Sequence, residues 1–151
     1  MIVVVMGVAG VGKTTIGRRL AAALGWDFYD ADDFHSPANV EKMHAGVALT
    51  DADREPWLDR LQALVADLGR RGRSAVLACS ALRRAYRARL AVAGIDVRFV
   101  HLTADPSTIR ARLAARGGHF MPASLLDSQL ATLEAPEDAV TVDVSDRKSV
   151  V

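Results

Sequence analysis

A glycine-rich loop follows the first apolar segment of the chain and ends in a lysine and two threonines. Residues 7–14 read Gly-Val-Ala-Gly-Val-Gly-Lys-Thr and match the pattern G-x-x-x-x-G-K-[S/T] at every fixed position. Glycines let the backbone curl with its N–H groups pointing inward, and a helix that begins at the end of such a loop adds partial positive charge. The loop is therefore typical of a phosphate-binding site.

We expect this loop to bind ATP together with Mg²⁺. Lys13 is predicted to reach the β and γ phosphates and to act in catalysis, and Thr14 is predicted to offer its hydroxyl to the metal. The alternative is a glycine turn with an incidental lysine, which the buried strand before the loop and the helix after it disfavour. The predicted nucleotide contacts are made by Gly7, Val8, Ala9, Gly10, Val11, Gly12, Lys13, Thr14 and Thr15.

The sequence after the third and fourth predicted strands narrows the class of nucleotide-binding protein. A guanine-reading N-K-x-D pattern is absent after the fourth strand, where residues 102–105 read Leu-Thr-Ala-Asp. The third strand, which ends near Cys79 and Ser80, lacks the carboxylate pair typical of ATPase motors. Both absences favour a small-molecule kinase over a GTPase switch or a motor.

Three aspartates follow the second predicted strand, at the edge of the sheet where parallel sheets bind their ligands. Asp32 is the candidate for the base that accepts or orients the proton of a substrate hydroxyl, and Asp30 is the candidate for a carboxylate supporting the metal. Strand alternation, if the strand extends this far, places Asp30 and Asp32 on one side and Asp33 on the other. The alternative is an acidic loop that caps the next helix, and Asp33 fits that role.

Apolar runs with the features of buried strands alternate along the chain with segments of helical periodicity. This alternation predicts βαβ crossovers and a parallel sheet covered on both faces, within one α/β domain spanning residues 1–151. The polar stretch 31–50 is expected to be irregular, with a short helix near Val40 to His44. The predicted strands are 2–6, 28–30, 74–79, 97–102 and 140–144, and the other predicted helices are 14–24, 53–70, 82–92, 108–116 and 125–133.

The composition is that of a globular protein without bulk affinity for nucleic acid or anionic membranes. Half of the 151 residues are apolar, a quarter are charged, and the formal net charge is +1. Cys79 is the only cysteine, which fits a reducing compartment, and the apolar start at Ile2 is too short for a signal peptide or a membrane span. We expect a cytoplasmic protein whose partner is a small molecule.

Several longer motifs resemble those of gluconokinases, which are small P-loop kinases related in fold to shikimate kinase. The resemblance runs from the glycine-rich loop to about Val144. Gluconokinases transfer the γ-phosphoryl group of ATP to the 6-hydroxyl of D-gluconate, and the resemblance implies this activity here. The motifs that carry it are DADDFH (30–35), NVEKM (39–43), LTDADREPWL (49–58), CSALRRAYR (79–87), GHFMP (118–122) and SQLATLE (128–134).

The resemblance also implies a fold. This is the three-layer α/β/α sandwich of P-loop kinases of the shikimate and nucleoside-monophosphate kinase type, built on a five-stranded parallel sheet. A substrate-binding insertion at about 31–52, a mobile lid at about 116–123 and a homodimer are further implications. Relatives place a final helix on the sheet after the last strand. The sequence ends at Val151, so we expect that helix to be missing and apolar sheet surface to be uncovered.

Five arginines are candidates for contacts with the phosphoryl group and the substrate. Arg112 and Arg116 lie four residues apart at the end of a predicted helix, where they could stabilise the transferring phosphoryl group. The alternative is a pair of solvated arginines that favour the helix dipole. Arg54, Arg83 and Arg87 are candidates for the gluconate carboxylate, with Arg54 and Arg83 preferred.

Polar side chains are also needed for the hydroxyls of a sugar acid. His35, His119 and Gln129 are the candidates, although either histidine could simply bond the backbone of its own loop. Trp57 begins the apolar stripe of its helix and is predicted to be a core residue. Cys79 is predicted to be a small buried residue and not a nucleophile.

Two other hypotheses stay open at this point. A kinase for a different small acid or polyol, such as shikimate, would share the glycine-rich loop but should lack the patterns at 79–82 and 118–120. A nucleotide-binding regulatory protein without turnover would fit the short C-terminus. A substrate panel separates the first from a gluconokinase, and the release of ADP separates the second.

Overall fold

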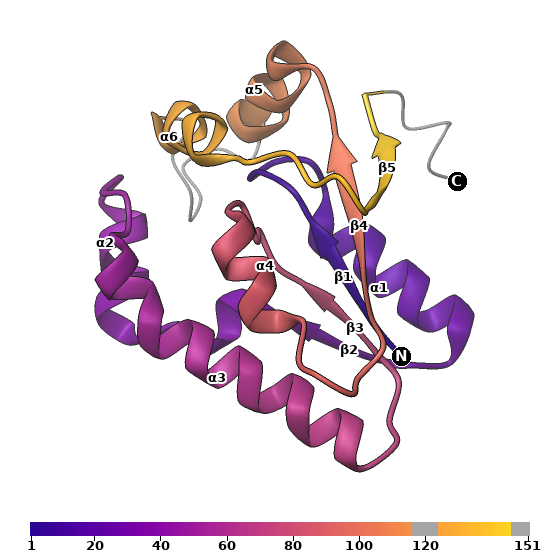
Figure 1. The fold of residues 1–151 in the computed structure, drawn as a ribbon. Coiled ribbons are helices and arrows are strands. Elements are labelled where there is room, and N and C mark those ends of the chain that lie inside the picture. The colour runs from indigo at the N-terminus through magenta and orange to yellow at the C-terminus, as the bar shows by residue number, and fades with distance from the viewer. Residues whose placement is uncertain (116–123, 146–151) are drawn as a thin grey trace.

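The computed structural model describes residues 1–115 and 124–145, and a parallel five-stranded sheet forms the centre of this part of the chain (Figure 1). The strands occur in the order β2-β3-β1-β4-β5, so β1 lies in the middle. Since all the pairings are parallel, the carboxyl ends of the strands meet at one edge. The strands are β1 (Ile2–Met6), β2 (Asp27–Asp30), β3 (Ala75–Ala78), β4 (Val97–Thr103) and β5 (Val140–Asp143).

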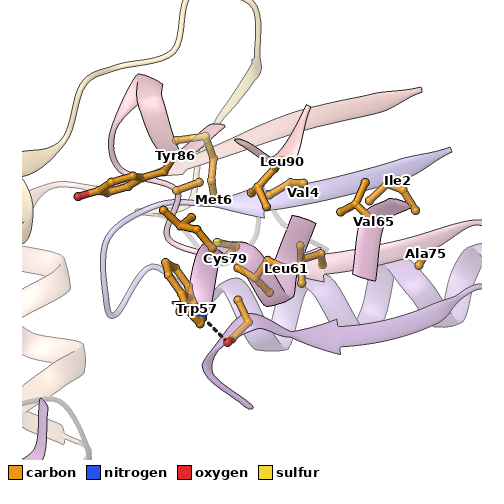
Figure 2. Packing of buried hydrophobic residues seen from close by; sticks show 14 of the residues in the cluster. Ile2, Val4, Met6, Trp57, Leu61, Val65, Ala75, Cys79, Tyr86 and Leu90 are labelled. Carbon is orange, nitrogen blue, oxygen red and sulfur yellow. Dashed lines mark hydrogen bonds between the residues drawn. The ribbon is translucent and has the colours of Figure 1, made fainter. Parts of the chain in front are cut away.

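The central strand is apolar at every position because it is covered on both faces. Its alternate side chains enter two different clusters of buried residues. Val3 and Val5 face α1 (Lys13–Leu24), α5 (Pro106–Ala115) and α6 (Ser124–Thr132). Ile2, Val4 and Met6 face α3 (Asp51–Arg70) and α4 (Arg84–Leu90), and Figure 2 shows this packing. The predicted three-layer sandwich on a parallel sheet is confirmed.

The segment between β2 and α3 contains two helices that the sequence only partly predicted. A short 3₁₀ helix, η1 (Ala31–Phe34), begins directly after β2, and α2 (Pro37–His44) follows it. The side chain of Ser36 accepts a hydrogen bond from the backbone of Asn39, which caps α2, and Pro37 occupies its first turn. α2 therefore begins three residues before the expected start at Val40.

Trp57 fixes this segment to the rest of the core. Its side chain is buried on the α3 side of the sheet, and its indole Nε1 donates a hydrogen bond of 2.7 Å to the carbonyl oxygen of Ala31 (Figure 2). The prediction that Trp57 is a core residue is confirmed. The bond satisfies the one polar atom of a buried indole and holds the start of η1 against α3.

Two helix starts also differ from expectation for local reasons. β2 ends at Asp30 as predicted, so the alternation that a longer strand would have imposed on the following aspartates does not apply. α3 begins at Asp51, two residues early, because Thr50 and Asp53 form a capping box. α4 begins two residues later than predicted because Arg83 has an extended backbone.

Residues 116–123 and 146–151 fall outside the described part of the chain. The expected lid and the candidates Arg116 and His119 lie there, and their roles stay predictions. None of the helices within 1–115 and 124–145 is long and apolar enough to cross a membrane.

Gly17 allows α1 to approach β2 closely. A Cβ atom at this position would lie 2.7 Å from Cε1 of Phe28 and 3.6 Å from Cγ1 of Val76. We predict that Gly17→Ala lowers the free energy of unfolding by about 1–3 kcal/mol through overpacking. The value is a net change: the cost of overpacking is expected to outweigh the gain of ~1 kcal/mol that alanine brings to a helix interior relative to glycine.

Urea denaturation followed by circular dichroism would measure the change. Ala22→Gly is the matched control, because Ala22 is exposed on the same helix and reports the propensity effect by itself. A Gly17→Ala protein more stable than wild type would contradict the close packing of α1 on the sheet.

Candidate active site

A cavity opens at the carboxyl edge of the sheet, between the glycine-rich loop, the ends of β2 and β3, the α2–α3 region and α6. Arg83, Arg87, Arg112 and the loop residues Gly7, Val8 and Val11 do not line it. The cavity brings together most of the predicted site residues in the described part of the chain: Ala9, Gly10, Gly12, Lys13, Thr14, Thr15, Asp30, Asp32, His35, Arg54 and Gln129.

The glycine-rich loop presents its backbone because its side chains are used elsewhere. The side chains of Val8, Ala9 and Val11 are buried, in the same cluster as residues of α5. Gly7 has a φ of 150°, and a Cβ atom there would lie 2.7 Å from the carbonyl oxygen of Leu102 on β4. Only glycine fits this approach, so the loop leaves β1 in a fixed direction.

Two side chains bind the loop from within the cavity. Nζ of Lys13 donates a hydrogen bond of 3.1 Å to the carbonyl oxygen of Val8. Oε1 of Gln129, on α6, accepts a hydrogen bond of 2.7 Å from the backbone N–H of Ala9. Gln129 was predicted to bind the substrate, and the structure places it beside the phosphate-binding loop as well as at the cavity wall.

Thr14 and Asp30 form a pair suited to a hard cation. The Thr14 hydroxyl donates to Oδ2 of Asp30 at 2.9 Å, and the backbone N–H of Asp32 donates to Oδ1 of Asp30 at 3.0 Å. The hydroxyl proton is committed to Asp30, so the lone pairs of the Thr14 oxygen are left for another ligand. These oxygen donors fit Mg²⁺, which retains waters and substrate phosphates and needs few protein ligands. Within 1–115 and 124–145 no three His, Cys, Asp or Glu side chains gather as a metal site by themselves.

The surroundings of Asp32 raise the pKa of its carboxyl group. Solvent reaches the side chain through the cavity, but its position at the cavity wall partly desolvates the carboxylate. This desolvation raises the pKa of Asp32 above its ordinary value, and repulsion from Asp30 raises it further, while Lys13 opposes both. A carboxylate that holds a proton more readily is a stronger base, which suits the role predicted for Asp32.

Arg54 reaches the cavity from α3 and is held there by α4. Its Nη1 donates to the hydroxyl of Tyr86 at 3.0 Å, and that hydroxyl donates to Asp51. The hydrogen bond from Tyr86 is the main cause of a lowered pKa of Asp51, to which Arg83 and Arg54 also contribute. Arg83 is exposed at the start of α4, beside this group but outside the cavity wall.

His35 lies flat against Trp57. The ring centroids are 4.4 Å apart and the planes differ by 11°. Burial lowers the pKa of His35 to about 4, and the positive charge of Arg54 acts in the same direction. The imidazole is therefore neutral at physiological pH, and it offers hydrogen bonds without adding a second positive charge beside Arg54.

Arg87 has a structural position that the sequence did not indicate. It is buried, and its Nη1 and Nη2 donate at 2.8 Å to the carbonyl oxygens of Ala81 and Glu134. Ala81 has a φ of 45°, a left-handed conformation that is costly for a residue with a side chain. Arg87 thus holds a strained turn and does not reach the cavity. Arg112 donates at 2.6 Å to the carbonyl oxygen of Val144, beyond β5.

The burial of Cys79 agrees with its predicted role. Its thiol is buried, and desolvation raises its pKa to about 12, so it carries no nucleophilic thiolate. Asn39, Asp51 and Tyr86 contribute to the site but were not among the predicted site residues. Each lies inside one of the quoted motifs, and this is the signal that the sequence offered.

Comparisons with known proteins agree with this geometry. A family model described as an AAA domain matches residues 2–136. The chain is 51% identical to a gluconokinase of Gluconobacter oxydans (strain 621H) over 146 residues, which are 96% of this chain and 82% of that protein. The chain belongs to the gluconokinase family.

Solved structures support the same family at the level of the fold. The crystal structure of a gluconokinase from Sinorhizobium meliloti 1021 has a TM-score of 0.82 and 42% identity, covering 98% of this chain and 88% of that one. The unliganded structure of a sugar kinase from Janibacter sp. HTCC2649 has a TM-score of 0.91 and 45% identity, covering 99% of this chain and 89% of that one. The family therefore extends over nearly all of this chain.

The contacts of Arg87 lead to a prediction that separates stability from substrate binding. Arg87→Met should lower the free energy of unfolding by about 2–3 kcal/mol, because two charged hydrogen bonds to backbone carbonyls are lost. Arg83→Met is the matched control, and its effect on stability should stay within about 0.5 kcal/mol because the side chain is exposed.

Chemical denaturation of both variants measures the difference. A stable Arg87→Met protein with weakened gluconate binding would restore the substrate role that the sequence suggested for Arg87.

Proposed function

We propose that this protein transfers the γ-phosphoryl group of ATP to the 6-hydroxyl of D-gluconate, in the catabolism of gluconate. A bond forms between the substrate oxygen and phosphorus, the bond between phosphorus and the β–γ bridging oxygen breaks, and the products are 6-phospho-D-gluconate and ADP. The observation that carries the proposal is a single cavity in which the phosphate-binding loop faces Asp32 and Arg54. Membership of the gluconokinase family supports the choice of acceptor.

Different residues act on the two substrates, ATP and gluconate. Backbone N–H groups of the loop and Nζ of Lys13 bind and orient the phosphates. Asp32 accepts the proton of the attacking hydroxyl, a role that its raised pKa favours. Arg54, oriented by Tyr86, binds the carboxylate of gluconate with its planar guanidinium.

Thr14 and Asp30 would hold Mg²⁺ together with the nucleotide phosphates. The cation would neutralise charge on the transferring phosphoryl group. Thr14 contributes its hydroxyl oxygen, and Asp30 orients that hydroxyl through the bond of 2.9 Å. We further propose that the protein works in the cytoplasm, where ATP is present and the lone Cys79 stays reduced, and that it forms the homodimer that the family resemblance implies.

Selective turnover of D-gluconate is the test of this function. ADP release would be measured with Mg²⁺-ATP and a panel of D-gluconate, shikimate and other sugar acids, with EDTA added in a parallel series. We expect turnover with D-gluconate and loss of turnover in EDTA. Preference for another acceptor would reassign the substrate, and folded protein that releases no ADP with any acceptor would refute the kinase assignment.

Asp32→Asn tests the base. The amide cannot accept the hydroxyl proton, so kcat should fall by about 10²–10⁴-fold. The Kd for ATP, measured by calorimetry, should change little because Asp32 does not belong to the phosphate-binding loop. Lys13→Ala is the comparison, since that variant should lose affinity for ATP as well as turnover. Equal losses of turnover and ATP affinity in Asp32→Asn would show that Asp32 serves the nucleotide or its metal instead.

A further inference from the structure

Asn39 is a buried polar residue of α2. It does not line the cavity itself but contacts His35, which does. Only 6% of the Asn39 surface is exposed. Its Nδ2 donates to the carbonyl oxygen of Asp53 at 2.8 Å and lies 3.3 Å from Nδ1 of His35. One amide nitrogen has two hydrogens, so both contacts can be made at once.

The contact with Asp53 settles which way the Asn39 amide faces. A backbone carbonyl only accepts hydrogen bonds, so the group that meets it at 2.8 Å must be the nitrogen. With the opposite orientation two oxygens would face each other in a buried place, at the cost of an unsatisfied carbonyl. The amide nitrogen therefore also faces His35.

This orientation determines the tautomer of His35. Because Asn39 presents a donor, Nδ1 of the imidazole must accept, and the ring proton resides on Nε2. Stacking on Trp57 fixes the plane of the ring, and Trp57 is itself anchored to Ala31. Within the described part of the chain Nδ1 is the only ring nitrogen of His35 with a hydrogen-bonding partner, so Nε2–H is the group that this cavity-lining residue offers to a ligand.

A neutral hydrogen-bond donor at His35 suits a site that already contains the positive charge of Arg54. Arg54 lines the same cavity, and burial, assisted by the charge of Arg54, lowers the pKa of His35 and keeps the imidazole in the neutral form. A sugar acid carries one carboxylate and a row of hydroxyls. One cation matches the carboxylate, and a neutral N–H matches a hydroxyl oxygen without attracting a second anion.

We propose that Asn39 is a positioning residue for the acceptor: it holds His35 as the Nε2–H tautomer, which donates a hydrogen bond to a hydroxyl oxygen of the sugar acid. This inference rests on the proposed function for the identity of the acceptor. The tautomer itself follows from contacts within the protein and can be tested without any substrate.

A purely structural role is the alternative that the test must exclude. Asn39 also joins α2 to the start of α3 through Asp53. Lys42 makes a second link between the same two helices, because its Nζ lies 2.8 Å from Oδ2 of Asp53. Lys42→Ala therefore weakens the same junction without touching His35, and it serves as the matched control.

The first arm of the experiment observes the tautomer directly. Long-range ¹H–¹⁵N spectra of protein labelled in histidine distinguish Nε2–H from Nδ1–H rings, with His35→Gln used to assign the signal. We expect the Nε2–H pattern in wild type and in Lys42→Ala, and a mixture of tautomers in Asn39→Ala. An Nδ1–H ring in wild type, or a tautomer unchanged in Asn39→Ala, would overturn the inference.

The second arm uses steady-state kinetics with D-gluconate. Asn39→Ala should raise KM for gluconate about tenfold, the loss expected for one hydrogen bond, with KM for ATP unchanged. In a His35→Gln background the side-chain amide donates from near the Nε2 position without help from Asn39, so adding Asn39→Ala should have little further effect. Additive effects, or an equal rise in KM with Lys42→Ala, would overturn the positioning role. Wild-type protein that does not use gluconate would refute the proposed function and the acceptor named here, while the spectra would still decide the tautomer.

Discussion

The site depends on the parallel pairing of β1 between β3 and β4. This register brings the carboxyl ends of the central strands to the same edge, where the glycine-rich loop, Asp30 and the turn after β3 must all leave the sheet. The backbone N–H of Gly7 bonds the carbonyl of Ser80 at 3.3 Å, so the loop and that turn are joined at their origins. β2 and β1 are separated by β3, yet Thr14 still reaches Asp30. A sheet with another strand order would separate these groups.

The charged groups differ between the two sides of the cavity. On one side, loop amides and Lys13 offer positive potential beside the carboxylates of Asp30 and Asp32, an arrangement that suits the phosphates of a nucleotide together with a cation. On the other side, Arg54 is the charged group and His35 is neutral. On the side of the glycine-rich loop, desolvation and repulsion from Asp30 raise the pKa of Asp32, and Lys13 opposes both. A proton acceptor placed there can serve a hydroxyl that approaches from the acceptor side.

The sequence predicted the parts of the fold that follow strong local patterns. The valine run of β1 and the periodicity of α3 predicted the sheet and the main covering helix, and these are confirmed, while the nucleotide contacts that the loop pattern predicted stay predictions. Ends of elements were less accurate because capping decided them, as with Thr50 at α3 and Ser36 at α2. The sequence made both Arg83 and Arg87 candidates for the gluconate carboxylate, with Arg83 preferred.

Tertiary contacts, which spacing does not encode, separated those two arginines. Arg87 turns inward to the carbonyls of Ala81 and Glu134, while Arg83 stays at the surface. The same limit applies to Asn39, whose importance depends on a carbonyl 14 residues away in the chain. A residue that acts through a neighbour is not marked by a sequence pattern of its own.

The segment from Ala31 to Thr50 has a consequence for how such enzymes diversify. It contributes His35 to the acceptor side, yet it contributes no strand to the sheet and lies outside the glycine-rich loop. Its described attachments to α3 include Ala31 with Trp57 and the links of Asn39 and Lys42 to Asp53. The same segment also carries Asp32, the proposed base, so a graft that retains Asp32 and these anchor points could exchange one small acceptor for another while the phosphate chemistry is kept.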